Sequence, residues 1–233
     1  MKYTVKPGVF QLNPELRFGI IVAKGLKNKL TSADETLRLR KPEEDARNTI
    51  KAEELKQQPI IAGYRKVLEK AGINPNKFVN SMEAMMKRVL KGGQLPTINS
   101  LVDLCNAISI ENQVSLGGHD LADIHDDLSV CFTKGDEKFL PFGAEEYEPV
   151  EARELVFTSG DIVQTRKWVW RQSELGKMTL DTKDVFFQLT GFDDAPDSPL
   201  SKAMDSLEET LKEKFGGTSQ RFIVKPQNPE IEF

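Results

Sequence analysis

Three polar side chains recur at helical spacing in the segment 98–110. Asn99, Asp103 and Asn106 are separated by four and three residues, so on a helix they form one stripe. Beside it runs an apolar face made of Ile98, Leu101, Val102, Cys105 and Ile108. Two amides and a carboxylate in one row can donate to and accept from a polar ligand. A helix face that is simply exposed to solvent would carry the same three polar residues, so both interpretations stay open.

Both tryptophans of the chain lie in the segment 161–173, whose alternation predicts a strand. On such a strand Trp168 and Trp170 share one face, close to several basic side chains. Aromatic rings interleaved with cations can stack a base or ribose beside phosphate contacts. The alternative is that both rings belong to the core of a sheet covered by helices. Candidate RNA contacts in this strand and on the helix after position 81 are Arg88, Arg166, Lys167 and Arg171.

The sequence Gly-Gly-His-Asp at 117–120 predicts a turn in which two glycines allow a ligand to approach the backbone closely. His119 and Asp120 are then candidate pocket residues, although a turn with a capping aspartate explains the same letters. The chain has no phosphate-binding loop, dinucleotide fingerprint, zinc-protease motif or nucleophile elbow. Its two cysteines have no zinc-ligand spacing. We therefore expect neither metal nor cofactor, and the motifs identify no catalytic residue.

The elements that must position these residues are helices followed by a run of strands. Expected strands cover 16–25, 128–133, 137–142, 154–159, 161–173, 184–192 and 221–226. Expected helices cover 43–58 with Pro42 in the first turn, 60–72, a segment capped by Ser81 and stopped at Gly92-Gly93, 98–110, and a segment from Pro199 to Gly216. Short connections and the absence of a composition break predict a single α+β domain over residues 1–233.

Composition sets further limits on function. The chain has 233 residues, 39% hydrophobic and 29% charged, as in ordinary globular proteins. No apolar run approaches a membrane span, the start lacks the apolar core of a signal peptide, and the cysteines resemble buried hydrophobes; we expect a cytoplasmic protein without membrane contact. A net charge of −4 argues against indiscriminate binding of nucleic acid but leaves a local basic patch possible.

The order of motifs over roughly residues 60–190 resembles the editing module of the phenylalanyl-tRNA synthetase β chain, also called the B3/4 or tRNA-binding domain. The matching segments are LVDLCN (101–106), the His119-Asp120-Leu121 turn, GDEKFLPFG (135–143) and TLDTKDVFFQ (179–188). Nothing resembles the catalytic core or the anticodon-binding parts of the synthetase. The chain is similar to a freestanding version of the module.

The resemblance implies a three-layer sandwich of two β-sheets and helices, and an activity that hydrolyses tyrosine wrongly esterified to the phenylalanine tRNA. The family's pocket glutamate, which recognises the tyrosine hydroxyl, falls at Gln188, and its histidine falls at Gly117, two places from His119. Its glycine-rich pocket wall falls near Trp170, Arg171 and Gln172, which are bulkier. The resemblance thus implies a retained pocket, with Gln172 and Gln188 among its residues, that no longer prefers tyrosine.

Two functions follow from this reasoning. The first is a freestanding editing module that binds aminoacyl-tRNA and hydrolyses a mischarged ester in trans, with tRNA or aminoacyl-tRNA as partner. The second is a noncatalytic module for a free amino acid or small metabolite in the same pocket. For both, we expect the pocket between the helix 98–110 and the strands 161–173 and 184–190.

Overall fold

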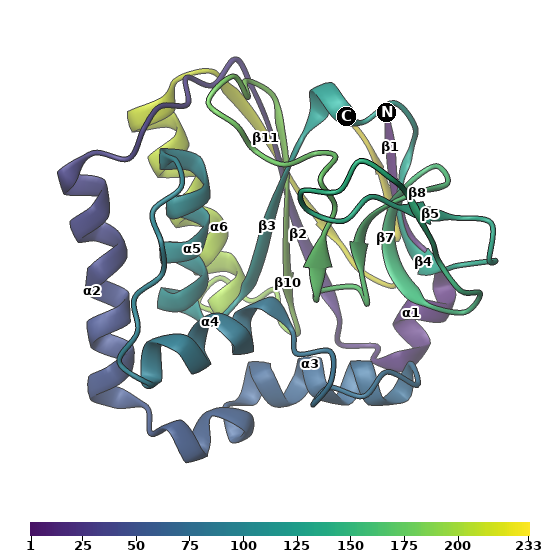
Figure 1. Cartoon of the computed structure of the whole chain (residues 1–233), viewed down its shortest axis with the longest axis horizontal. Helices are drawn as coiled ribbons and strands as arrows, with labels where there is room; N and C mark the ends of the chain where they lie inside the picture. Colours follow the sequence, from purple (N-terminus) through teal and green to yellow (C-terminus); the bar gives the residue numbers. More distant parts are fainter.

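The structure, a computed structural model, describes all residues from 1 to 233 and contains two β-sheets and a set of helices (Figure 1). The strands are β1 (Lys2–Val5), β2 (Arg17–Lys24), β3 (Ser115–Asp120), β4 (Leu128–Phe132), β5 (Lys138–Phe139), β6 (Glu148–Pro149), β7 (Leu155–Ser159), β8 (Ile162–Arg166), β9 (Arg171–Gln172), β10 (Val185–Gly191), β11 (Thr218–Val224) and β12 (Glu230–Glu232). The helices are α1 (Pro7–Leu12), α2 (Ala33–Thr49), α3 (Pro59–Lys70), α4 (Ser81–Leu90), α5 (Ser100–Asn112) and α6 (Pro199–Thr210), which a π-helical turn extends through Leu211–Phe215; short 3-10 segments cover Ala52–Gln57 and Leu121–Asp123.

The two sheets divide the molecule into layers. The four-stranded sheet has the order β11-β2-β10-β3, and the larger sheet has the order β12-β1-β4-β7-β8-β5-β6, with β9 paired to β8. Helices α5 and α6 cover one face of the four-stranded sheet, and the larger sheet covers its other face (Figure 1). The arrangement is the expected α+β sandwich of helices, sheet and sheet. None of its helices combines the length and the apolar character that crossing a membrane requires.

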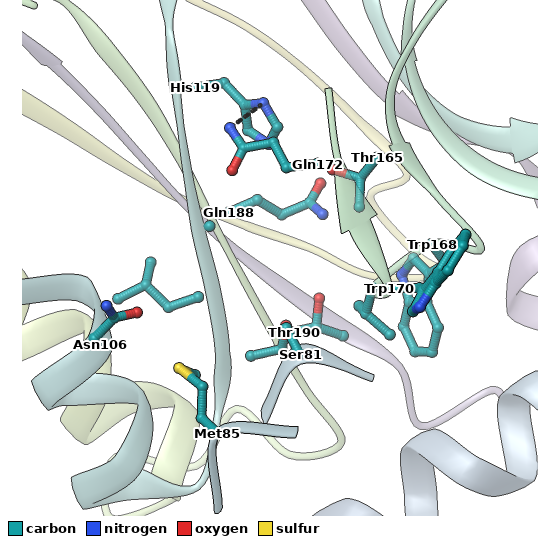
Figure 2. A pocket seen from close by; sticks show the side chains of 14 residues that line it. Ser81, Met85, Asn106, His119, Thr165, Trp168, Trp170, Gln172, Gln188 and Thr190 are labelled. Atoms are coloured by element: carbon teal, nitrogen blue, oxygen red, sulfur yellow. Dashed lines mark hydrogen bonds between the residues drawn. The ribbon is translucent and has the colours of Figure 1, made fainter. Parts of the chain in front are cut away.

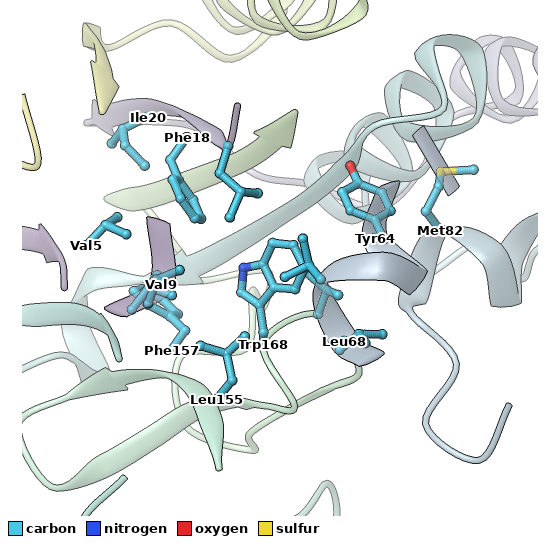
Figure 3. Packing of buried hydrophobic residues seen from close by; sticks show 14 of the residues in the cluster. Val5, Val9, Phe18, Ile20, Tyr64, Leu68, Met82, Leu155, Phe157 and Trp168 are labelled. Atoms are coloured by element: carbon cyan, nitrogen blue, oxygen red, sulfur yellow. The ribbon is translucent and has the colours of Figure 1, made fainter. Parts of the chain in front are cut away.

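Successive side chains of the central strands β2 and β10 point to opposite faces of the sheet, so they belong to two separate cores. Phe18 and Ile20 of β2 and Phe186 of β10 face the larger sheet, where the inter-sheet core also contains Trp168 (Figure 3). The residues between them in sequence, such as Phe187 of β10, pack against α5 and α6. A strand buried on both faces is apolar throughout, so the two polar residues on the inter-sheet face of β10, Gln188 and Thr190, are exceptions that mark the site.

Four expected elements differ in the structure. The helix expected at 43–58 is α2, which begins 10 residues earlier because Ser32 and Glu35 form a complete capping box, and Pro42 lies inside it. The expected turn at 117–120 is strand β3, paired with β10 in the register Gln188↔Gly117. Helix α4 is capped by Asn80, whose side chain accepts from the Glu83 amide, and Ser81 is its first residue.

The expected strand 161–173 is instead two strands joined by a tight reversal. The chain turns at Lys167 and Trp168, whose φ angles of 48° and 64° lie in the left-handed region. The reversal directs β9 back along β8, so Thr165 pairs with Gln172. The expectation that both tryptophans share one face of one strand is therefore wrong. Trp168 is buried in the inter-sheet core, as the alternative held, and Trp170 is partly exposed.

Candidate functional site

The inter-sheet core ends in a cavity of about 190 Å³, here called the inner cavity. It lies between β3 and β10 of the four-stranded sheet and the β8–β9 turn of the larger sheet, and α4 and α5 border it (Figure 2). Six predicted site residues line it: Asn106, His119, Trp168, Trp170, Gln172 and Gln188. The predicted location between the helix 98–110 and the two strand segments is thus the location of a cavity, although the segment 161–173 borders it as a hairpin.

A second cavity of about 510 Å³, the outer cavity, adjoins the first. The two share a wall formed by Asn106, Leu116, Gly117 and Gln172. The outer cavity is lined by three large apolar side chains that remain open to solvent, namely Ile98 (56% exposed), Phe142 (58%) and Leu180 (48%). Ile98 was expected in the buried face of α5, but it precedes the helix and lies on this rim.

The register of β3 and β10 builds the polar end of the inner cavity. Gln188 lies opposite Gly117, and the residues two places along β3, Ser115 and His119, share the face of Gly117. Because Gly117 has no side chain, the space beside Gln188 stays open. The Nε2 atom of His119 lies 3.8 Å from the position that a Cβ at residue 117 would occupy. The His119 imidazole thus lies beside Gly117, the position to which the resemblance assigns the family's histidine.

His119 is buried and uncharged. Burial lowers its pKa to about 4, against a smaller opposing effect of the nearby Gln164 amide. Its ring packs edge-on against Phe157 at a centroid distance of 4.9 Å. Its Nδ1 faces the side-chain nitrogen of Gln172 at 3.5 Å, and that nitrogen also donates to the Gly118 carbonyl at 3.0 Å (Figure 2). Near neutral pH the imidazole is therefore a hydrogen-bonding group rather than a cation.

The other polar residues of the predicted stripe have structural roles. Asn99 is the N-cap of α5, accepts from the Val102 amide at 3.1 Å, and borders only the outer cavity. Asp103 accepts from the Thr31 hydroxyl at 2.6 Å on a different side of the helix. Only Asn106 borders both cavities. The expected single polar stripe is therefore divided, because residues four and three apart on α5 meet different neighbours.

Asp120 and Asp103 lie outside both cavities, which corrects the expectation that they line the pocket. Asp120 accepts from the Thr182 hydroxyl at 2.5 Å and caps the turn after β3 by accepting from the Ala122 amide at 3.0 Å. Capping of this turn and the bond from Thr182 engage both carboxylate oxygens of Asp120. No group of three or more histidine, cysteine, aspartate and glutamate side chains forms a possible metal site.

Two of the predicted RNA-binding residues are engaged inside the protein. Arg166 binds the buried carboxylate of Glu154 through Nε (3.0 Å) and a terminal nitrogen (2.7 Å), and the Lys167 ammonium binds the same carboxylate. Arg171 is exposed, with its guanidinium 5.1 Å from the Trp170 ring. Arg88 is also exposed and donates to the Gln94 carbonyl at 2.7 Å. Of the four, Arg88 and Arg171 present their charge to solvent.

Several lining residues carry no recognisable motif: Ser81, Met85, Ser115, Thr165 and Thr190. The sequence did contain a signal for one of them, Thr190. VFFQLTG (185–191) is an apolar strand interrupted by Gln188 and Thr190 at a spacing of two, so both point to one buried face. Buried polar groups within a strand need partners, and an adjoining polar cavity supplies that environment.

Comparisons with known proteins identify the family. The family model of the B3/4 domain matches residues 63–204, more than half of the chain. Among solved structures, an N-terminal fragment of the phenylalanyl-tRNA synthetase β-subunit from Pyrococcus horikoshii is similar, with 14% identity and a TM-score of 0.46. That alignment covers 95% of this chain and 53% of the other, so this chain spans about half the length of the fragment. No curated protein matches the chain. The match over residues 63–204 shows that the chain belongs to the B3/4 domain family.

Proposed function

We propose that this protein binds the aminoacyl end of a mischarged tRNA and hydrolyses the ester in trans. One observation carries the proposal: a polar inner cavity without a charged side chain adjoins, at Asn106, an outer cavity with an exposed apolar rim. The amino-acid side chain would occupy the inner cavity, the ester would lie at Asn106, and the terminal nucleoside would occupy the outer cavity. Membership of the B3/4 family supports the same assignment.

The charges around the cavities favour an ester over a free amino acid. A free amino acid has a carboxylate, and burying an unpaired charge is costly. No lysine or arginine lines the inner cavity, and Lys177 is the one charged residue that borders the outer cavity. An esterified amino acid has no free carboxylate, so it avoids the cost of burying that charge and carries only the charge of its α-amino group.

Hydrolysis at this site would depend on positioning rather than on a strong base. The Asn106 side chain lies at the shared wall, where its amide can donate to the oxyanion that develops when water attacks the ester carbonyl. No carboxylate borders the inner cavity, and the low pKa of about 4 makes the neutral His119 ring a weak base. As the bond between the carbonyl carbon and the ribose oxygen breaks, the vicinal hydroxyl of the terminal ribose would pass its own proton to the leaving oxygen and take up the proton of the attacking water.

The tRNA contacts would come from the rim of the site. Phe142, Ile98 and Leu180 offer an exposed apolar surface against which a terminal base can stack or pack. Arg171 and Arg88 are exposed cations on β9 and α4, two elements that border the inner cavity, and they can contact backbone phosphates. Arg166 and Lys167 would act indirectly, because their bonds to Glu154 hold the Trp168 turn in place.

The second candidate is a noncatalytic module that binds a small metabolite in the same cavities. The absence of a carboxylate or other ready base from the inner cavity favours it. A neutral polar ligand would satisfy the same side chains. The two candidates differ in whether an ester is cleaved.

A deacylation screen tests the proposal. Purified protein would be incubated with a panel of mischarged tRNAs, in parallel with Asn106→Ala and the control Asn112→Ala. Asn112 lies on the same helix, bonds the Ile108 carbonyl at 3.1 Å and borders neither cavity. We expect hydrolysis of at least one ester, a loss on the order of 100-fold in Asn106→Ala, as for removal of one oxyanion donor, and little change in the control. Absence of cleavage with retained binding of a small ligand would establish the second candidate instead.

A further inference from the structure

The hydrogen bond between Tyr3 and Gln188 joins the two sheets behind the inner cavity. Tyr3 lies on β1 of the larger sheet, is fully buried, and donates from its hydroxyl to Gln188 Oε1 at 2.8 Å. The two residues are 185 positions apart in the sequence. Gln188 is the residue to which the resemblance assigns the family's pocket glutamate, and Tyr3 lies outside the matched residues 63–204.

This bond fixes which end of the Gln188 amide faces the ligand. The Tyr3 hydroxyl is a neutral donor, because burial raises its pKa well above the ordinary value. Its proton finds an acceptor only if the carbonyl of Gln188 faces it, since rotating the amide by half a turn would bring a second donor there. The carbonyl is therefore occupied by Tyr3, and the amide nitrogen with its two protons remains for the cavity that Gln188 lines.

His119 adds a neutral polar group to the same wall. The Gln172 nitrogen near Nδ1 donates to the carbonyls of Gly118 at 3.0 Å and Gly176 at 3.3 Å, so both of its protons have acceptors and the contact does not assign the tautomer of the ring. The Nε2 atom lies beside Gly117 at the cavity wall, where its role as donor or acceptor follows from the tautomer. Gln188 thus presents its N–H groups to the cavity, and neither residue is charged.

We propose that the inner cavity selects a neutral side chain with a hydrogen-bond acceptor, such as a carboxamide or a hydroxyl, and that Tyr3 is the positioning residue that sets this preference through Gln188. The inference rests on the proposed function for the statement that the ligand is an aminoacyl group. Aliphatic side chains leave the Gln188 N–H groups unpaired, which costs binding free energy. Acidic side chains bring a charge into a cavity that no cation lines.

The test compares isosteric pairs of esters, each pair on one tRNA: threonyl with valyl, and asparaginyl with leucyl. For the wild type we expect the acceptor-bearing member of each pair to have a kcat/KM at least about tenfold higher. In Tyr3→Phe the Gln188 amide is free to rotate, so that preference should fall by about twofold when the two amide orientations are equally populated. Tyr147→Phe is the control, because Tyr147 is about half exposed and borders neither cavity.

The Gln188→Leu variant distinguishes the contact of Gln188 with the ligand from the orientation of Gln188 by Tyr3. This variant keeps the side-chain volume but removes the donor, so it should lose the preference for acceptors and make the Tyr3→Phe substitution silent in the double variant. An unchanged ratio of acceptor to aliphatic substrates in Tyr3→Phe would overturn the positioning role. A wild type that cleaves all four esters equally would overturn the selectivity and leave the proposed hydrolysis intact.

A binding measurement keeps the inference testable without catalysis. The side-chain amide protons of Gln188, assigned by comparison with Gln188→Leu, would be followed by NMR during titration with asparaginamide and leucinamide, two uncleaved mimics. We expect a larger shift and tighter binding with asparaginamide, and a reduction of that difference in Tyr3→Phe. Equal responses to the two mimics would overturn the inference even if every ester in the panel resists hydrolysis.

Discussion

Replacement of Glu154 by glutamine tests how the turn beside the inner cavity is held. Glu154 is buried, and its carboxylate accepts from the Arg166 guanidinium, the Lys167 ammonium and the Lys167 backbone amide. Lys167 and the following Trp168 both have positive φ, a conformation that costs non-glycine residues free energy. The three contacts therefore stabilise a reversal that the chain would otherwise avoid.

The loss of stability expected for Glu154→Gln follows from the burial of the carboxylate and of the two cations that it binds. The side chains of Arg166 and Lys167 are only 18% and 14% exposed, so Glu154→Gln leaves two mostly buried cations without their main counter-charge. Breaking a buried pair costs about 3–5 kcal/mol. Arg166 keeps Glu148 at 3.6 Å and both cations keep some solvent, which reduces the expected loss to about 2–3 kcal/mol. For a chain of this size that loss lowers Tm by roughly 4–12 °C.

The assay is urea unfolding at pH 7, with tryptophan emission of the folded state recorded in parallel. Trp168 is almost fully buried, so a relaxed turn should shift the emission to longer wavelength. The control is Glu146→Gln, an exposed glutamate without an ion pair. A loss below about 1 kcal/mol in Glu154→Gln, the value of a surface pair, with unchanged emission would refute this account of the turn.

The contribution of Glu154 and its two cations to the stability of the protein also depends on pH, in a direction that its pKa defines. Burial alone would raise the pKa of Glu154, but hydrogen bonds from Arg166 and Lys167 outweigh it and hold the pKa below its ordinary value. The pair's contribution is therefore complete above the unfolded pKa of about 4.3 and is lost as pH falls through the lower folded pKa. The difference in stability between wild type and Glu154→Gln should accordingly shrink below pH of about 4.

Three further predictions concern packing, titration and RNA contact. Gly19→Ala should destabilise the protein by about 1–3 kcal/mol in urea unfolding, because the new Cβ would lie within a clash distance of Met204 on α6; unchanged stability would contradict the close packing of α6. The His119 ring should titrate by NMR near its pKa of about 4, and because the unfolded value is about 6.5, stability should fall as pH drops from 6.5 towards 4; titration near 6.5 would contradict its burial. Arg171→Ala should weaken tRNA binding and lower the slope of log K against log salt by about 1, whereas the exposed Arg47→Ala on α2 should not; equal effects would rule out a specific role for Arg171.

The sequence predicted best those elements whose pattern is local. Helices α4 and α5 and strand β10 lie close to their expected positions. The apolar residues that each element buries lie within one short segment, so their pattern can be recognised in the sequence. The capping box at Ser32 and Glu35 was also present in the sequence and would have placed the start of α2 correctly.

Features that depend on distant partners could not be predicted in the same way. SLGGHD becomes strand β3 because it pairs along β10, about 70 residues later, although its glycines favour a turn. The reversal at Lys167 and Trp168 has no glycine to mark it and depends on the contacts of Glu154.

The sequence indicated which segments border the candidate site, but not all of the hydrogen bonds made by its polar residues. The resemblance brought Gln188 and Asn106 to one pocket, and the structure places both at the inner cavity. Tyr3 contributes from the far end of the chain through a contact that no sequence spacing encodes. Asp103 and Asp120 looked equally suitable as site residues, yet local capping and side-chain bonds account for them.

A structure of the protein with a non-hydrolysable analogue of an aminoacylated tRNA end tests the central claim most directly. The ligand would be adenosine carrying a threonyl or asparaginyl group in amide linkage at its 3′ position. We predict that the α-carbonyl oxygen lies within hydrogen-bond distance of the Asn106 amide, the amino-acid side chain contacts Gln188 and His119, and adenine packs against Phe142. An analogue bound outside the two cavities, or with adenine in the inner one, would contradict the account.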